Sequence, residues 1–338
     1  MRGDQRVDVA RNAFTHPLDR VVVYLFIFGF GYIYVHMIPW VEIFGEDWKD
    51  ISRYLFRIAY LARGGEEREY SGISVLFSEI LWKEILLWIN QFFESHREGL
   101  FFCSYLALVF YSLFTFRRVN ILLALVFFFN PMFIDLILGQ IRMALAFSLL
   151  LWAYGMRERR VIFFMLLSVS VMIHTGTLLF MGIYLVLKKM DERYGKEIFY
   201  KLSLIFGILF AFFIKYGLIL ILFIVGDRRA DSYASGSIAS SSMAFSLTWF
   251  MVALLLAFEA DYEHEEQRMI VGFSIVMMSL MFSLSTLHLY GQRYVAISVP
   301  LIIISIGYLP KPLKQWTLIY LFIYQFLQWK YRLVLTII

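Results

Sequence analysis

The sequence contains almost no cysteine and little charge. Its 338 residues include a single cysteine, Cys103, so no disulfide can form within the chain. Cys103 lies in an apolar run, where a cysteine usually packs as a small hydrophobic residue rather than acting in catalysis. Charged residues make up 17% of the chain and hydrophobic residues 61%, which excludes an ordinary soluble domain. The composition therefore predicts a protein that crosses a membrane several times.

The sequence also lacks the motifs of several common enzyme classes. It has no His-Glu-x-x-His motif, no phosphate-binding glycine loop, no Gly-x-Ser-x-Gly and no Asp-x-Asp. The acidic run at residues 263–266 is typical of a solvated loop rather than a metal site. The net charge of +5 comes mostly from Lys and Arg in loops, which indicate membrane orientation and not nucleic-acid binding. We therefore expect no metal, no other cofactor and no nucleic-acid partner.

Apolar runs recur along the whole chain. A helix that crosses a bilayer needs ~20 residues. The runs that approach this length cover residues 21–41, 99–116, 121–138, 142–156, 202–225, 244–258, 269–287, 294–309 and 316–338. The polar residues 1–20 carry four arginines and are expected to be a cytoplasmic N-terminus, not a cleaved signal peptide. The sequence thus predicts an all-α polytopic membrane protein with about nine full spans, in one integral membrane domain over residues 1–338.

The apolar run at residues 161–187 permits two topologies. Basic clusters flank it on both sides, and a single tilted helix would put them on opposite sides of the membrane. A hairpin of two short helices, broken at His174, Thr175 and Gly176, would keep both clusters in the cytoplasm. Basic loops tend to stay inside, so we favour the hairpin. This choice places the Gly139–Arg142 turn, the 226–243 loop and the 288–293 turn outside.

The longest segment between predicted spans covers residues 42–98 and is expected to be periplasmic. Within it, residues 73–94 are amphipathic at helical spacing, with polar side chains on one stripe at Glu79, Lys83, Asn90 and Glu94. Several charges in the middle of this stretch argue against a span. We therefore expect a helix that lies in the outer membrane interface, with its tryptophans at the depth of the lipid headgroups.

Ionisable residues within apolar sequence gather between residues 130 and 174. An ionisable side chain in lipid costs at least ~2.5 kcal/mol, so its presence suggests a function. In one continuous helix, Asp135, Gly139 and Arg142 would share a face. Arg142 could form a structural ion pair with Asp135, or it could hold a phosphate through its forked donors, and both can be true at once. We favour the phosphate role.

Further candidate residues lie in the turns expected outside. Arg293 is either an interfacial arginine that reaches lipid headgroups or, with Arg228 and Arg229, part of a cationic cluster suited to pyrophosphate. Tyr233 lies in a stretch rich in Ser, Gly and Ala, which is either a plain loop or a mobile lid that sets Tyr233 against sugar. Lys215 is a basic residue within an apolar run that this scheme leaves unexplained.

His174 is the best candidate for proton transfer. Imidazole is a common general base when a hydroxyl must be activated, although a histidine at a helix break can also be purely structural. The sequence does not decide whether Asp47, Glu79 or His174 is the base.

Four short stretches resemble the EpsG/Wzy-type bacterial polysaccharide polymerases. They are Gly45-Glu46-Asp47-Trp48 after the first span, Gly139-Gln140-Ile141-Arg142-Met143-Ala144-Leu145-Ala146, His174 in its short apolar hairpin, and Gln292-Arg293-Tyr294. The order of these features resembles the family over nearly the whole chain. One departure is Ile51, where the family often has a tyrosine.

The resemblance implies a metal-independent glycosyltransferase in the bacterial inner membrane, with its active site facing the periplasm. Its donor would be a growing glycan on undecaprenyl pyrophosphate and its acceptor a single lipid-linked repeat unit, with a chain-length regulator as a possible protein partner. The expected catalytic residues are His174, Arg142 and Asp47. The residues expected to bind pyrophosphate or sugar are Arg142, Gln140, Arg293, Arg228, Arg229, Tyr233 and Tyr290.

Two alternatives remain open. An O-antigen ligase-like enzyme would share the donor chemistry and differ in its acceptor. A flippase or other transporter of lipid-linked oligosaccharides would show paired repeats and polar residues through both leaflets, whereas the buried charge here gathers on the outer side.

Overall fold

The computed structural model describes residues 17–44, 48–65, 79–218, 220, 242–260 and 264–337, and every regular element in them is a helix. This confirms the all-α fold class. The chain forms two compact units, one containing residues up to Leu178 and from Gln328 onward, the other Leu179–Leu327.

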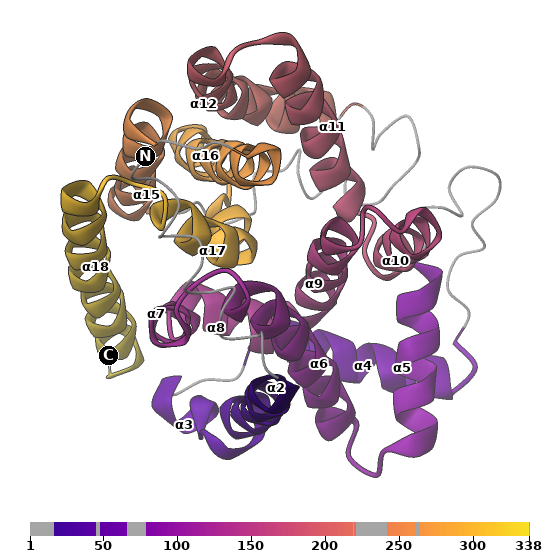
Figure 1. The fold of residues 1–338 in the computed structure, drawn as a ribbon. Helices are drawn as coiled ribbons and strands as arrows, with labels where there is room; N and C mark the ends of the chain where they lie inside the picture. The colour runs from indigo at the N-terminus through magenta and orange to yellow at the C-terminus, as the bar shows by residue number, and fades with distance from the viewer. Residues whose placement is uncertain are drawn as a thin grey trace. The chain divides into compact units, whose positions relative to one another are not determined.

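The helices of the first unit (Figure 1) are α2 (Pro17–Tyr32), the π-helix η1 (Ile33–Met37), α3 (Trp40–Phe44), α4 (Lys49–Ala62), α5 (Ile80–Phe92), α6 (His96–Phe116), α7 (Ile121–Phe128), α8 (Pro131–Leu138), α9 (Ile141–Gly155) and α10 (Arg160–Ile173). The helices that lie wholly or mainly in the second unit are α11 (Thr177–Arg193), α12 (Lys196–Phe212), the π-helix η3 (Phe213–Leu218), α15 (Met243–Glu259), α16 (Glu265–Thr286), α17 (Gln292–Ile306) and α18 (Lys311–Ile337).

Four helical stretches among the described residues are long and apolar enough to cross a membrane. They are Arg20–Met37, His96–Phe116, Glu197–Gly217 and Glu265–Thr286. Three other predicted spans, at residues 142–156, 244–258 and 294–309, fall on apolar helices of 15 to 17 residues, at or below the lower limit of about 17 for a straight span. Several apolar helices thus indicate a membrane protein, with four or five candidate spans, while the count of nine stays a prediction.

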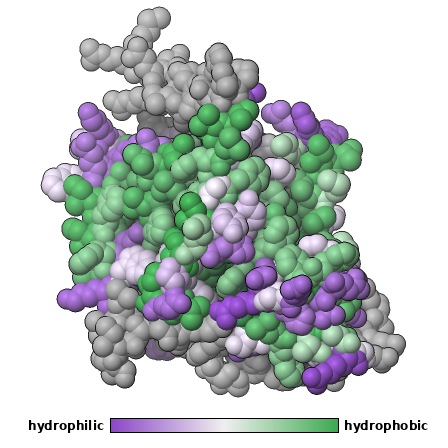
Figure 2. Space-filling model, turned by 90° about the horizontal axis from the view of Figure 1, so that it is seen from below, coloured by the Kyte–Doolittle hydropathy of each residue, from purple (hydrophilic) through white to green (hydrophobic). Residues whose placement is uncertain are grey.

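The surface carries the apolar side chains that a lipid environment requires. On α2, Val22 is 62% exposed and Leu25 is 67% exposed. Figure 2 shows hydrophobic side chains over much of one face, with many hydrophilic side chains toward the lower part of the view. Large apolar side chains left exposed at this density favour contact with lipid rather than with water.

The run predicted as one span over residues 121–138 is two helices, α7 and α8, bent by 74°. Asn130 caps the start of α8, because its side-chain oxygen accepts a hydrogen bond from the Met132 N–H at 2.9 Å and Pro131 follows it in the first turn. The Asn130 side-chain amide donates to Gln328 at 3.1 Å. The Phe128 carbonyl at the break accepts the Tyr34 hydroxyl at 2.7 Å. Satisfied backbone groups make such a break tolerable within apolar surroundings.

Helix α9 is central to the first unit, since it packs against both α6 and α10 (Figure 1). Its small residue Ala146 is fully buried, and its carbonyl accepts a hydrogen bond from the Ser170 hydroxyl of α10 at 2.7 Å. Small residues and serine hydroxyls at helix contacts are typical of packing within membranes. This packing fixes the start of α9 relative to the end of α10.

Helix α16 has the same role in the second unit, where it packs against α12, α15 and α17. The helices approach closely at glycines: a Cβ at Gly207 would come within 2.0 Å of the Ser279 hydroxyl, and one at Gly272 within 2.6 Å of the Phe199 ring. The Ser305 hydroxyl of α17 donates to that of Ser274 at 3.0 Å.

The predicted break at His174 is present, since α10 ends at Ile173 and α11 begins at Thr177. The return of both helices to one side of the membrane stays a prediction. Within the predicted amphipathic stretch, α5 covers Ile80–Phe92 and buries Trp82, Leu86 and Ile89 on one face. Helix α4, before it, was not predicted.

The hairpin can be tested by cysteine labelling from outside the cell. Cysteines at the exposed positions Arg159 and Lys189 should both escape a membrane-impermeant reagent, because both ends of the hairpin are expected in the cytoplasm. A cysteine at the exposed Arg63, in the segment expected outside, should react. The native protein is the control, since its Cys103 is buried. Labelling of only one of the two hairpin positions would refute the hairpin.

Candidate functional site

Glu79 is the residue on which the candidate site converges. It comes directly before α5 and has a left-handed backbone, with φ 52° and ψ 48°. Its side chain is only 8% exposed. A left-handed conformation is uncommon for glutamate, and such conformations persist mainly where surrounding contacts enforce them.

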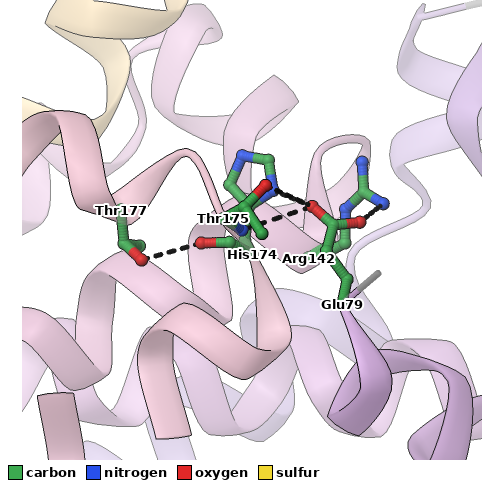
Figure 3. Close-up of polar contacts among 5 residues, drawn as sticks. All are labelled: Glu79, Arg142, His174, Thr175 and Thr177. Carbon is green, nitrogen blue, oxygen red and sulfur yellow. Dashed lines mark hydrogen bonds and ion pairs between the residues drawn. The ribbon is translucent and has the colours of Figure 1, made fainter. Parts of the chain in front are cut away.

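Both oxygens of the Glu79 carboxylate are engaged (Figure 3). Oε2 accepts a hydrogen bond from the guanidinium of Arg142 in an ion pair. Oε1 lies 2.8 Å from Nδ1 of His174, and the backbone N–H and the hydroxyl of Thr175 approach it at 3.3 and 3.4 Å. One carboxylate therefore joins three segments that lie far apart in the sequence, all within the first unit.

Arg142 is the second residue of α9 and follows a tight turn after α8. At Gly139 a Cβ would come within 2.7 Å of both the Asp135 carbonyl oxygen and the Trp48 ring, so the turn has room only for glycine. The Gln140 side-chain amide donates to the Asp135 carboxylate at 3.0 Å. The two helices thus do not form the continuous helix considered for these residues, and the ion pair of Arg142 is with Glu79.

His174 ends α10 in an extended conformation, with φ −148° and ψ 109°. Its N–H donates to the Ser170 carbonyl at 3.0 Å, and its carbonyl accepts the Thr177 hydroxyl at 2.7 Å. The imidazole is 14% exposed, and a Cβ at Gly176 would come within 2.7 Å of its Nε2. The ring is therefore fixed at Nδ1 by Glu79, while Gly176 leaves space beside Nε2.

Tyr54 of α4 supports Arg142 from another side. Its ring packs edge-on against Trp82 of α5 with the centroids 5.3 Å apart. Burial raises the pKa of the Tyr54 hydroxyl to about 12, and the charge of Arg142 and a hydrogen bond with the Arg142 backbone act in the opposite direction. Tyr54 therefore stays neutral at physiological pH.

Arg293 and Tyr290 belong to the second unit. The Arg293 guanidinium lies over the Tyr290 ring, 5.2 Å from its centroid, and its Nε is buried without a hydrogen-bond partner among the described residues. Lys215, in η3, donates to the Leu287 carbonyl at 3.3 Å. This carbonyl lies at the C-terminal end of α16, where a cation is favourable, which explains the lysine in an apolar run.

The structure thus brings together two of the predicted site residues, Arg142 and His174, and places Gln140 in the same turn as Arg142. Four others, Asp47, Arg228, Arg229 and Tyr233, lie outside the described residues. In the part of the chain that the structure describes, no three His, Cys, Asp or Glu side chains are grouped so as to hold a metal ion.

The role of Glu79 was only partly visible in the sequence, where it was one of three possible bases. Helical spacing assigned it to a polar stripe with Lys83, Asn90 and Glu94, but α5 begins at Ile80. The left-handed backbone at Glu79 removes it from that pattern and lets its carboxylate be buried. Tyr54 gave no signal, because α4 was not expected.

The geometry combines a guanidinium, an imidazole and a carboxylate around one point. Such a cluster can bind an oxyanion and accept a proton. A reaction that transfers a group onto a hydroxyl requires both. The Arg142 side chain is 27% exposed, so it remains accessible to an anion, whereas the Glu79 side chain is buried.

Comparison with known proteins identifies the family. The chain matches the EpsG family over residues 20–337, nearly its whole length. No match was found among curated proteins or among solved structures. The match confirms the family suggested by the short stretches around Arg142 and Arg293. The chain therefore belongs to the EpsG family, whose members are Wzy-type polysaccharide polymerases.

Proposed function

We propose that the protein polymerises a bacterial polysaccharide by transferring a growing glycan from undecaprenyl pyrophosphate to the non-reducing end of a lipid-linked repeat unit. The reaction takes place at the periplasmic face of the inner membrane and needs no metal. The observation that carries the proposal is the joining of Arg142 and His174 through Glu79, in a chain of the EpsG family.

Arg142 holds the pyrophosphate of the donor in this proposal. As the bond between the sugar carbon and the phosphate oxygen breaks, the electron pair and negative charge remain on the departing pyrophosphate. A guanidinium beside that oxygen lowers the barrier, because electrostatic stabilisation acts where charge develops. Its two parallel donors also match the geometry of phosphate oxygens.

His174 accepts the proton of the acceptor hydroxyl. The hydroxyl oxygen forms the new bond to the sugar carbon, and its proton moves to the imidazole. The charge balance closes with a protonated His174 and an anionic pyrophosphate, and the proton then returns to solvent or to the leaving group. Activation already resides in the lipid pyrophosphate, so no nucleotide takes part.

The remaining predicted residues supply binding. Gln140 lies in the turn before Arg142, where its side chain is held by Asp135 at 3.0 Å. Arg293, with Tyr290 beneath its guanidinium, offers a second cation for a lipid-linked substrate. Asp47, Arg228, Arg229 and Tyr233 remain candidates for catalysis or for contact with pyrophosphate and sugar. The lipid bilayer and a chain-length regulator are the other proposed partners.

Deletion of the gene tests the function directly. Cells without the protein should still make and export single lipid-linked repeat units, and should attach one unit to the final carrier in place of a ladder of lengths. The measurement is gel electrophoresis of the extracted glycan with analysis of the lipid-linked pool. Long polymer left on undecaprenyl pyrophosphate would indicate a ligase, and single units stranded on the cytoplasmic leaflet a flippase. Either pattern would overturn the proposal.

His174→Ala should reproduce the deletion pattern. Loss of a general base typically costs 10²–10⁴-fold in rate, so we expect at least a ~100-fold loss of polymer. Membrane abundance should be unchanged, because the substitution removes one side chain at a helix break. His264→Ala is the matched control, since His264 is exposed. Normal ladders in His174→Ala would exclude the imidazole from the reaction.

Arg142→Lys separates charge from geometry. The variant keeps the positive charge and loses the fork, so it should be nearly as inactive as Arg142→Ala if phosphate is held by two donors. One lost charge-assisted hydrogen bond is worth about 1.5–3 kcal/mol, which is roughly a 10- to 150-fold loss of polymerisation rate. Arg53→Lys is the control, because Arg53 is 77% exposed and pairs with the neighbouring Asp50 of its own helix. Full activity of Arg142→Lys would show that charge alone suffices.

A further inference from the structure

We propose that Glu79 is the positioning residue of the reaction, which sets the imidazole of His174 for proton transfer and the guanidinium of Arg142 for phosphate binding at once. This inference rests on the proposed function and extends it to a residue that does not itself contact the substrate. Both side chains contact the same carboxylate.

The hydrogen bond to Glu79 determines which imidazole nitrogen does the chemistry. An ionised carboxylate only accepts hydrogen bonds, so the Nδ1 that lies 2.8 Å from Oε1 carries the hydrogen. A neutral imidazole protonated at Nδ1 takes up its next proton at Nε2. A carboxylate behind a histidine also stabilises the imidazolium that forms, as in other histidine-based sites.

The second oxygen of Glu79 sets the position of Arg142. The ion pair orients the guanidinium and offsets the desolvation of a carboxylate that is only 8% exposed. The 27% of Arg142 that stays exposed leaves part of the guanidinium available to a phosphate. The Glu79 carboxylate thus sets the distance between the guanidinium of Arg142, which would bind the anion, and the imidazole of His174, which would accept the proton.

The backbone at Glu79 supports a role beyond packing. Its φ of 52° lies in the left-handed region, where a glycine or asparagine is the usual residue. A glutamate at this position does not stabilise the left-handed backbone conformation. The carboxylate contacts with Arg142, His174 and Thr175 are what its side chain adds.

Gly176 gives a separate test of imidazole placement that leaves Glu79 intact. Gly176→Ala would put a Cβ within 2.7 Å of Nε2, so the ring would have to leave its present position. A displacement of about 1 Å can cost ~100-fold in rate, so kcat should fall by about that factor while the KM for the donor stays unchanged. Gly182→Ala is the matched control, because a Cβ at Gly182 meets nothing within 4 Å. Unchanged kcat in Gly176→Ala would contradict the placement.

The decisive experiment measures double-mutant cycles. Membrane vesicles that carry each variant would receive the single lipid-linked units accumulated by the deletion strain, and chain growth would be timed. Glu79→Gln keeps the size and removes the charge, so we expect a fall in kcat of about 100-fold or more. Combined with His174→Ala or with Arg142→Ala, it should cost at least ~10-fold less than the product of the single effects, because residues that act as a unit are non-additive.

Two controls keep the outcomes distinct. Glu84→Gln changes an exposed glutamate of α5, the helix that Glu79 precedes, and should match the native rate. Glu79→Gly removes the carboxylate but suits the left-handed backbone, so it should fold normally and still be as slow as Glu79→Gln. Near-native activity of either Glu79 variant, or effects that multiply in both cycles, would overturn the role of Glu79. Active His174→Ala and Arg142→Ala variants would instead overturn the proposed function.

Discussion

The burial of the Glu79 carboxylate is the constraint on which the first unit's site depends. A buried carboxylate is costly unless donors surround it, and here a guanidinium, an imidazole, an amide and a hydroxyl all face its two oxygens. The segments that supply them are fixed independently by helix packing, because α9 lies against both α6 and α10. The ion pair therefore links the segment between α3 and α6 to the apolar helix α9.

Short and broken helices are what place these charged groups together. Helix α8 stops at Leu138 and α10 stops at Ile173, and each stop exposes backbone groups that only protein contacts can satisfy in an apolar environment. At the end of α8, the backbone N–H groups of Gly139 and Gln140 donate to carbonyls of the last turn. At the end of α10, the His174 N–H donates to the Ser170 carbonyl, and the Thr177 hydroxyl donates to the His174 carbonyl. An unbroken helix through either point would carry Arg142 or His174 out of reach of Glu79. The helices too short to be plain spans are thus the ones that build the site.

Periodicity and local chemistry predicted much of this arrangement from the sequence. The all-α class and the break at His174 followed from apolar runs and local interruptions in them. An ion pair with a carboxylate was one of the two roles considered for Arg142, and such a pair is present. The identity of that carboxylate did not follow, because Asp135 is seven residues away and Glu79 is 63 residues away. Sequence spacing offers local partners, whereas packing of distant segments selects the actual one. The 74° bend at Asn130 was not predicted, because a single asparagine inside a long apolar run does not by itself indicate that the helix ends there.

The two units share one local design at their arginines. Gly139-Gln140-Ile141-Arg142 precedes and opens α9, and Gly291-Gln292-Arg293 does the same for α17. At both glycines a Cβ would approach a carbonyl oxygen too closely, at 2.7 Å from Asp135 and 2.8 Å from Met281. Each arginine is the second residue of its helix. It lies beside the first N–H groups of the helix, which have no partner within the helix and attract anions. In the proposed reaction both lipid-linked substrates carry a pyrophosphate, and each of these two turns places a cationic side chain at a helix start, where anions are favoured.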